Sequence, residues 1–383
     1  MVKRTILEKI SLMNILFITN ALPPEVDGVG DYTLNLAKEF AKHGHEVSIV
    51  CKKSNKVLID CTEVGIYPIV NKWNKSAAGQ VKQLMQQRSV EMVCLQYVPH
   101  GFEPHGLPLG LLLFMQELKK AGTPIFTFFH EICIGYSFNV NRLVGAFLMG
   151  MIARLIAKKS LIIATSIEHY KKCLNKLGVN KNVAIIPIPS NIPECNLTES
   201  EVSKLKKTIA SKDEKLITLF GNRDFSQVIS AIRNLIKKGE RIKVIALGKA
   251  NRSIPKEHFI YFTGAMEISE LSAFLKVTDI LILPEDTKSG CSLKSGSLAA
   301  SLQFGIPTIT TRGFMTDKSL DVLFLFAKEN SVSEYEHIIA MLLDDLEKRE
   351  NMRWNNFKFA ETLTWKVTYD KYIELILSHK SIN

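Results

Sequence analysis

The sequence lacks the features of an extracellular, zinc-binding or membrane-spanning protein. Its seven cysteines include no C-x-x-C pair, and such an odd, scattered set argues against a disulfide framework or a zinc site. The longest apolar stretch, residues 143–153, is shorter than the roughly 20 residues needed to cross a bilayer. The first residues also lack the apolar region and small-residue cleavage site of a secretory signal. We therefore expect reduced thiols and a cytoplasmic location.

Two common catalytic motifs are also missing. The chain has no G-x-x-x-x-G-K-[ST] loop and no H-E-x-x-H sequence, which removes the usual signals for nucleoside triphosphate hydrolysis and zinc proteolysis. No low-complexity tract indicates disorder. The basic residues are scattered and are not interleaved with aromatic residues in one stretch, so we expect no nucleic-acid partner.

The length of 383 residues predicts two domains, because single hydrophobic cores stop growing at about 250–300 residues. The segment IPIPSNIPECN, residues 186–196, contains three prolines, and this composition favours an extended linker over a helix or a central strand. We place a hinge near Ser190. The predicted domains are residues 1–190 and 191–383.

Short apolar runs alternate with longer amphipathic ones in both halves, which is typical of βαβ units around a parallel sheet. We predict an α/β protein with two Rossmann-like, doubly wound domains. Ligands of such sheets bind beyond the carboxyl ends of the strands, so we expect the two sheets to face a central cleft. No strand follows residue 350, and we expect the C-terminal helices to pack back on the N-terminal domain. The predicted strands are residues 15–19, 46–50, 92–96, 125–129, 161–164, 184–186, 216–220, 243–247, 260–263, 280–283 and 308–310.

Positive charge is concentrated in the first half. Residues 1–190 contain 22 Lys or Arg and 13 Asp or Glu, a net charge of +9, which leaves +2 for residues 191–383. Such a field attracts anionic lipid headgroups or phosphorylated acceptors, although a solvated surface is the alternative. The apolar and basic stretch Asn139 to Lys159 is a candidate for peripheral contact with an anionic membrane at its inner face. A buried core helix is the favoured interpretation of this stretch.

The first predicted strand leads into the glycine-containing segment LPPEVDGVGDYTLNLAKEF. Gly28 and Gly30 allow a tight turn before a helix that we expect to start near Asp31, and a ligand can approach the backbone closely there. The alternative is a glycine turn that only the strand-to-helix geometry requires, because G-x-G alone is a weak signal.

His130 and Glu131 follow an apolar strand, which places two polar side chains at the carboxyl edge of the first sheet. The histidine can donate a hydrogen bond to a substrate hydroxyl or stabilise developing charge, and the adjacent carboxylate can orient it. A simple cap of the strand end is the alternative.

Two segments of the second half combine positive charge with free amide hydrogens. The sequence GNRD follows a predicted strand and presents Asn222 and Arg223, and a guanidinium there can clamp a diphosphate. A second group of small and basic residues immediately precedes an apolar helix, whose N-terminus is a ready anion site. The alternatives are a surface arginine that closes a turn and a serine that only caps the helix. This second group is Ser292, Lys294, Ser295, Gly296 and Ser297.

Taken together, these segments resemble the family 4 glycosyltransferases, a large group of retaining enzymes with the GT-B fold. The resemblance spans nearly the whole chain, and the order and spacing of the segments are more specific than any single piece. It rests on NILFITNALPPEVDGVGDYTLNLAKEFAKHGHEV, LQYVPHGFEPHGLP, FFHE, IPIPSNIP, FTGAMEISELSAFLKVTDILILP and SGSLAASLQFGIPTITT.

The resemblance implies that a hexosyl group moves from a nucleotide-sugar donor to an acceptor with retention of configuration. By this likeness, Gly28 and Gly30 face the donor phosphates and sugar, and His130 contacts the sugar. Arg223 and Lys294 neutralise the diphosphate. The backbone of Gly264, Ala265 and Met266 holds the base. The other donor-binding candidates are Glu131, Asn222, Glu285, Asp286, Ser292, Ser295, Gly296 and Ser297.

The sequence departs from the family at a pair of glutamates eight residues apart. Counting back from Gly305, these positions hold Ser292 and Ala300, whereas the second glutamate of the family usually grips the ribose. Glu285 and Asp286 are candidate substitutes. The lysine that usually follows the family's arginine is also missing, and the cation at position 294 is its candidate replacement.

We expect neither a metal nor an organic cofactor, with the nucleotide sugar as substrate and a polysaccharide, lipid-linked or phosphorylated acceptor. Two alternatives from other classes stay open. A GT-B sugar-nucleotide epimerase or hydrolase shares the cleft but needs no separate acceptor. A non-catalytic nucleotide-sugar-binding protein would account for the missing glutamates.

Overall fold

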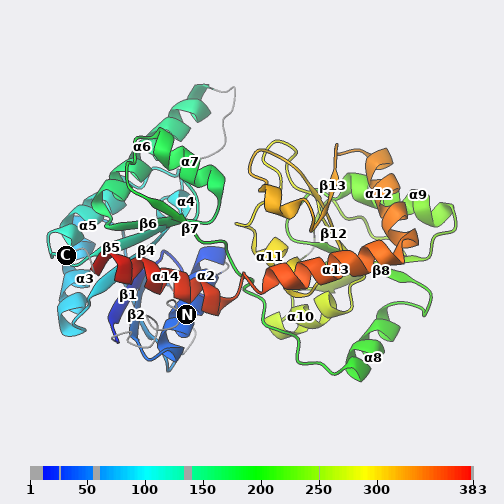
Figure 1. Cartoon of the computed structure of the whole chain (residues 1–383), viewed down its shortest axis with the longest axis horizontal. Helices are drawn as coiled ribbons and strands as arrows, with labels where there is room; N and C mark the ends of the chain where they lie inside the picture. Colours follow the sequence, from blue (N-terminus) through cyan, green and yellow to red (C-terminus); the bar gives the residue numbers. More distant parts are fainter. Residues whose placement is uncertain (1–11, 26, 55–60, 133–139, 250, 381–383) are drawn as a thin grey trace. The chain divides into compact units, whose positions relative to one another are not determined.

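A computed structural model describes residues 12–25, 27–54, 61–132, 140–249 and 251–380, with the backbone alone for residues 140–142 and 380. The chain divides into two compact units (Figure 1). Unit 1 is Met1–Pro187 together with Trp365–Asn383, and unit 2 is Ile188–Thr364. The boundary lies close to the hinge predicted at Ser190.

Unit 1 is built on a seven-stranded sheet with the order β3-β2-β1-β4-β5-β6-β7. All neighbouring strands are parallel, and Ile18 at the end of β1 pairs with Val50 on one side and Leu95 on the other. The order reverses between β1 and β4, the kind of switch point at which open parallel sheets bind ligands. The strands are β1 (Asn14–Ile18), β2 (Glu46–Lys52), β3 (Gly65–Val70), β4 (Met92–Tyr97), β5 (Ile125–Phe129), β6 (Ile162–Thr165) and β7 (Val183–Ile185).

The last helix of the chain, α14, packs on the sheet of unit 1 beside α2. Tyr372 stacks on Phe126 of β5 with 4.4 Å between ring centroids, and the Tyr369 hydroxyl lies 3.0 Å from Nε2 of His45. These aromatic contacts bury large side chains, the main source of packing energy. The helices of unit 1 are α2 (Gly28–Lys42), α3 (Lys75–Gln87), α4 (Pro99–Phe102), α5 (Leu109–Lys119), α6 (Val140–Lys159), α7 (Glu168–Lys176) and α14 (Trp365–Lys380).

Unit 2 is built on a six-stranded parallel sheet with the order β10-β9-β8-β11-β12-β13. Its order reverses between β8 and β11. Both sheets are therefore parallel and doubly wound, which confirms the predicted α/β class. The strands are β8 (Lys215–Phe220), β9 (Ile242–Leu247), β10 (Ile260–Gly264), β11 (Ile280–Leu283), β12 (Thr308–Thr311) and β13 (Leu325–Ala327).

The core of unit 2 lies between the sheet and the helices that cover it. Apolar side chains of α9 and α12, such as Ile232 and Ile339, are fully buried against Ile217 and Val244 of the central strands. The helices are α8 (Glu199–Ile209), α9 (Ser226–Lys237), α10 (Ile268–Lys276), α11 (Gly296–Gln303), the 3-10 helix η2 (Lys318–Leu320), α12 (Val332–Asp344) and α13 (Leu346–Ala360).

The predicted strands all occur within two residues of their observed bounds, but β3 and β13 were not predicted. Both lie at a sheet edge. β3 contains Pro68 and is mostly half-buried, and proline in a strand is tolerated at an edge but argues against a central strand. β13 has only three residues. The proline of β3 and the short length of β13 make these two edge strands hard to predict, whereas the edge strands β7 and β10 are among the predicted ones.

The favoured interpretation of residues 139–159 as a buried core helix is wrong for one face of α6. Met149 and Ile152 are buried, whereas Leu143 and Phe147 are 47% and 63% exposed. An apolar composition on both faces hides this difference from a sequence pattern, since a helix that is apolar all round reads as buried. Asn139 lies outside the described residues, as does the side chain of Arg142. In the described part of the chain, no helix combines the length and apolarity needed to cross a bilayer.

The helix α2 begins three residues earlier than predicted, because Asp27 caps it. The Asp27 carboxylate accepts a hydrogen bond from the amide of Val29 at 3.1 Å, which satisfies one of the free amides at a helix start. The two glycines at this start differ in environment. A Cβ on Gly30 would lie 2.4 Å from the carbonyl oxygen of Ala21, whereas a Cβ on Gly28 would meet nothing within 4 Å.

We therefore expect Gly30→Ala to lower the free energy of unfolding by about 1–3 kcal/mol, since a backbone carbonyl must shift to admit the methyl group. Gly28→Ala is the matched control and is expected to leave stability unchanged within about 0.5 kcal/mol. Urea unfolding of the two variants and the wild type measures both values. Equal stability of the two variants would contradict the close packing of Gly30.

Candidate functional site

The switch point of unit 2 collects the polar residues of the second half. Arg223 follows β8 and Glu285 follows β11, the two strands at which the sheet order reverses. The helix α11 begins after the same β11 connection. Parallel strands present their carboxyl ends at one edge, so these segments meet where open sheets bind ligands.

The turn after β8 is shaped so that Arg223 folds back along the strand end. Gly221 has φ +88°, a conformation that L side chains rarely adopt, and a Cβ there would collide with Nη1 of Arg223. Asn251 and Ser253 donate hydrogen bonds to the carbonyl oxygen of Arg223 at 2.7 and 3.2 Å. The arginine is therefore held through its backbone as well as its side chain. Asn222 beside it is exposed.

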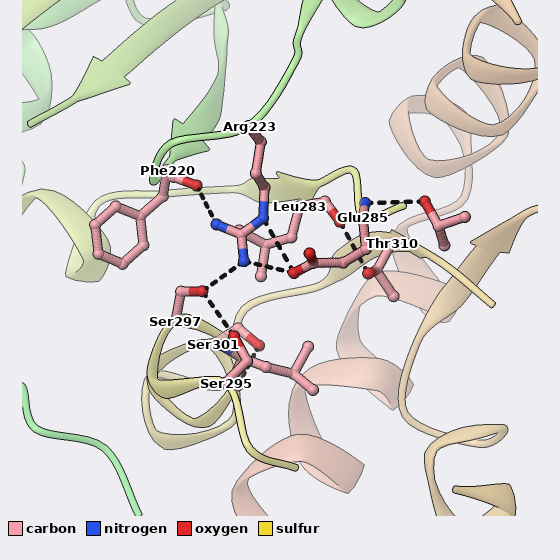
Figure 2. Close-up of polar contacts among 10 residues, drawn as sticks. Phe220, Arg223, Leu283, Glu285, Ser295, Ser297, Ser301 and Thr310 are labelled. Carbon is pink, nitrogen blue, oxygen red and sulfur yellow. Dashed lines mark hydrogen bonds and ion pairs between the residues drawn. The ribbon is translucent and has the colours of Figure 1, made fainter. Parts of the chain in front are cut away.

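The Arg223 guanidinium connects three segments of unit 2 (Figure 2). Its Nη1 donates to the carbonyl oxygen of Phe220 at 2.8 Å, and its Nη2 donates to Oγ of Ser297 at 2.9 Å. Nε and Nη2 both donate to Oε1 of Glu285, at 3.1 and 2.5 Å. The guanidinium thus ties the end of β8 to the loop after β11 and to the first turn of α11.

These bonds occupy most of the hydrogen-bonding capacity of Arg223. A guanidinium has five N–H donors, and these four bonds use all of them except one N–H on Nη1. The side chain is only 13% exposed. A phosphate group reaches the cation fully only if it replaces the Glu285 carboxylate. The structure therefore pairs two residues that the sequence analysis assigned separately, to the diphosphate and to the ribose.

The start of α11 shows the predicted cap. Ser295 accepts a hydrogen bond from the amide of Leu298 at 3.4 Å, and its Oγ lies 3.0 Å from Oγ of Ser297. Lys294 and Gly296 are half-buried beside them, and Ser292 is buried. Because the first amides of a helix have no intrahelical acceptor, the capped turn retains donors for an anion. Ser295 therefore caps α11, and this role is compatible with anion binding.

The loop after β11 is built around Asp286 and two closely packed glycines. The Asp286 carboxylate accepts hydrogen bonds from the amide of Lys288 at 3.0 Å and from Oγ of Ser289 at 3.3 Å. Gly290 and Gly313 approach so closely that a Cβ on either would lie 2.3 Å or less from backbone atoms of the other segment. Asp286 therefore shapes its own turn. Ala300, at the position of the family's second glutamate, is fully buried.

The segment expected to hold the base lies at the end of β10. Gly264 has φ +72° and Ala265 is exposed, while Met266 is half-buried. The capping box of Glu267 and Glu270 starts α10 directly afterwards. A positive φ at this glycine turns the chain sharply and leaves backbone groups accessible to a ligand.

In unit 1, His130 lies at the carboxyl edge of the sheet and is 5% exposed. Its Nε2 lies 2.9 Å from Oε1 of Gln96 on β4, and the rings of Tyr32 and Phe128 pack around it with centroids 4.8 and 4.6 Å away. Burial lowers the pKa of His130 from 6.5 to about 3, because the aromatic surroundings disfavour the charged ring. The imidazole is therefore neutral at physiological pH.

Gln96, and not Glu131, is the described hydrogen-bond partner of the His130 ring. The sequence analysis missed Gln96 because it lies inside an apolar strand 34 residues earlier. The register pairs Gln96 with Phe128, two residues before the histidine. The sequence does contain one signal for Gln96, namely an amide side chain near the end of an otherwise apolar strand. A buried amide group needs a hydrogen-bond partner, so such a position indicates a polar contact.

A second missed residue is Asp31 in the first turn of α2. Burial, together with the negative charge of Asp27, raises the pKa of Asp31 from 3.8 to about 6. Burial also raises the pKa of Asp27, although the amides of Val29 and Gly30 act in the opposite direction. Two carboxyl groups therefore lie beside the glycine loop of unit 1, where like charges disfavour double ionisation.

Within the described residues, no group of three or more His, Cys, Asp or Glu is arranged to hold a metal ion. The six described cysteines are free thiols, and Cys133 lies outside the described residues. The metal-free, cofactor-free site stays a prediction.

Comparisons with known proteins place these features in a class. Residues 26–189 match the model of the family described as Glycosyltransferase Family 4. A search of curated proteins finds no match. Sucrose-phosphate synthase from Thermosynechococcus elongatus has a similar structure, with 11% identity, 97% of this chain and 100% of that chain covered, and a TM-score of 0.71.

Two further solved structures share the fold. HepE from Anabaena, in complex with UDP and glucose, is 13% identical over 96% of this chain and all of that chain, with a TM-score of 0.67. The UDP-GlcNAc 2-epimerase from Neisseria meningitidis, bound to UDP-GlcNAc, is 11% identical over 96% of this chain and all of that chain, with a TM-score of 0.58. At such identities, the likeness concerns the fold alone.

The two parallel sheets and their neighbours define the class as GT-B. The match over residues 26–189 confirms the resemblance of this part of the chain to the family 4 glycosyltransferases. The site roles given to individual residues stay predictions.

The raised pKa of Asp31 predicts a pH-dependent effect of Asp31→Asn. Between about pH 4 and 6 the folded chain binds more protons at this carboxyl than the unfolded chain does, so ionisation destabilises the fold as pH rises through this window. We expect the variant to have a higher Tm than the wild type at pH 7, with a difference that shrinks as pH falls towards 4. Thermal melts across this range test it. Glu63→Gln, at an exposed carboxylate, is the control and should show no such trend.

Proposed function

We propose that the chain transfers a hexosyl group from a nucleotide sugar to a hydroxyl acceptor, with retention of configuration and without a metal. The observation that carries the proposal is the Arg223 guanidinium, which is hydrogen-bonded to Ser297 at the start of α11, at the switch point of unit 2. A cation beside a capped helix N-terminus suits a diphosphate, because the helix dipole and the free amides favour negative charge.

The diphosphate is the leaving group in this reaction. The bond from the anomeric carbon to the diphosphate oxygen breaks, a bond to the acceptor oxygen forms, and the acceptor proton passes to a phosphate oxygen. Negative charge grows on the diphosphate as the bond breaks. Arg223, Lys294 and the amides of α11 stabilise this charge in place of a metal, which is the main catalytic contribution that such a site makes.

Donor binding requires Arg223 to exchange partners. In the structure its Nε and Nη2 donate to Glu285, and a phosphate oxygen takes over these donors because its geometry also suits bidentate binding. The released Glu285 carboxylate is then available to accept hydrogen bonds from the ribose hydroxyls. This exchange accounts for a ribose-binding carboxylate despite the alanine at position 300.

His130 acts as a neutral hydrogen-bonding group towards the sugar. With its pKa lowered to about 3 by burial, the ring carries no charge at neutral pH. It therefore orients an uncharged hydroxyl and does not stabilise negative charge as an imidazolium would. The hydrogen bond with Gln96 fixes the direction of the ring.

The proposed acceptor is a carbohydrate, a lipid-linked saccharide or a phosphorylated compound, and the proposed location is the cytoplasm. The net charge of +9 in residues 1–190 supports a peripheral contact with anionic lipid, because exposed Lys and Arg are attracted to anionic headgroups. Such a contact brings the enzyme to a lipid-linked acceptor.

A nucleotide sugar should stabilise the chain by mass action. At about 100 times its Kd, a true donor is expected to raise Tm by roughly 5 °C or more. UDP-glucose and UDP-N-acetylglucosamine belong in the first screen, since similar structures hold UDP with glucose or UDP-GlcNAc. Product analysis of the stabilising donor, with and without acceptors, then separates transfer from epimerisation and hydrolysis. Turnover of the donor alone to an epimer would reject the proposed function.

Lys294→Ala should lose most of its turnover while remaining folded, with kcat reduced about a hundredfold, because one charge that stabilises the leaving group is removed. Lys288→Ala is the matched control, since Lys288 is an exposed lysine of the same loop, and it should keep wild-type kinetics. Steady-state rates and circular dichroism of both variants make the test. Unchanged kinetics of the first variant would remove Lys294 from the mechanism.

A further inference from the structure

The helix α6 presents an apolar face to solvent. Leu143, Val144, Phe147 and Leu148 are 47%, 52%, 63% and 42% exposed, and Leu155 in the same helix is 38% exposed. With about 100° per residue, from 3.6 residues per turn, these positions fall within about 140° of the helix circumference. The opposite face, with Met149, Ile152 and Ile156, is buried. We call the five exposed residues the α6 ridge.

The ridge is an unusual surface for a protein chain in water. Isolated exposed apolar residues need no explanation, but a contiguous apolar row on one helix face marks a site of interaction. The residues at positions 143, 144, 147 and 148 are neighbours at helical spacing and form one strip, and Leu155 lies on the same face about two turns further along. Phe147 is the most exposed of them.

Basic residues are frequent in α6 and in the segment that follows it. Residues 140–181 hold eight Lys or Arg and a single acidic residue, Glu168. Lys158 is exposed and half-buried Arg154 falls on the same side of α6 as the ridge, at the same helical spacing. The neighbouring helix α7 packs against α6 and adds Lys171, Lys172 and Lys176.

We propose that the α6 ridge docks the chain on an anionic lipid bilayer. An apolar strip flanked by Lys and Arg is the composition of a helix that lies in the membrane interface, with apolar side chains among the acyl chains and cations at the headgroups. A second protein surface would satisfy the apolar strip, but the excess of one sign of charge over 42 residues favours a surface that is itself uniformly negative.

This inference rests on the peripheral contact proposed above and names the surface that makes it. It is tested without donor or acceptor, so its failure leaves the transfer reaction untouched. The full chain is mixed with vesicles of phosphatidylcholine alone or of equal parts phosphatidylcholine and phosphatidylglycerol, and the bound fraction is measured by flotation. We expect the wild type to float with the anionic vesicles, far less with the neutral ones, and less at high salt.

The double variant Val144→Ser, Phe147→Ser should bind the anionic vesicles at least about tenfold more weakly, because two exposed apolar side chains are removed from the strip. Lys158→Glu should also weaken binding, and should do so mainly at low salt. Trp354→Ser is the matched control, since Trp354 is an exposed apolar residue of α13 in unit 2, and it should float as the wild type does.

Three results would overturn the proposal. The wild type does not float with anionic vesicles, or the double variant floats as well as the wild type. In the third result, neither protein floats, and without lipid the wild type is a dimer whereas the double variant is a monomer. The ridge would then be an interface between two copies of this chain. Melting temperatures of all variants, within about 2 °C of the wild type, confirm that each variant is folded.

Discussion

The contact of Arg223 with Glu285 and Ser297 is the interaction on which the candidate donor site depends. A mostly buried guanidinium must have its donors satisfied, and the chain achieves this with a backbone carbonyl from β8, a carboxylate from the loop after β11 and a hydroxyl from α11. The same bonds that stabilise the cation therefore hold together three segments of the candidate donor site. A phosphate that enters this site does not bind to a free arginine but competes for one that is already bound.

The carboxyl edge of the sheet in unit 1, in contrast to the site around Arg223, disfavours charged groups. This edge buries a neutral histidine among Tyr32 and Phe128 and raises the pKa of Asp31, so burial there disfavours charge. The two units therefore differ in the character of their strand ends: ionic groups gather at the switch point of unit 2, whereas the carboxyl edge of unit 1 buries a neutral imidazole.

The helices α14 and α6 both belong to unit 1 but differ in how they pack. Tyr372 of α14 stacks on Phe126 and lies against Tyr32, so the last apolar segment of the chain completes the core of unit 1. Phe147 of α6, in contrast, is 63% exposed. The two helices of the same unit therefore differ in role: α14 completes the core, and one face of α6 lies at the surface.

The sequence by itself determined the alternation of strands and helices, the α/β class and the central strands, because period and turn residues are local properties. It also identified Arg223, Ser295 and Ser297 as residues at strand and helix ends. Only the tertiary structure decided that Arg223 pairs with Glu285, 62 residues away, that Gln96 and not Glu131 holds His130, and that one face of α6 is exposed. These outcomes depend on which strands become neighbours and which helix face meets the sheet, and no local pattern contains that information.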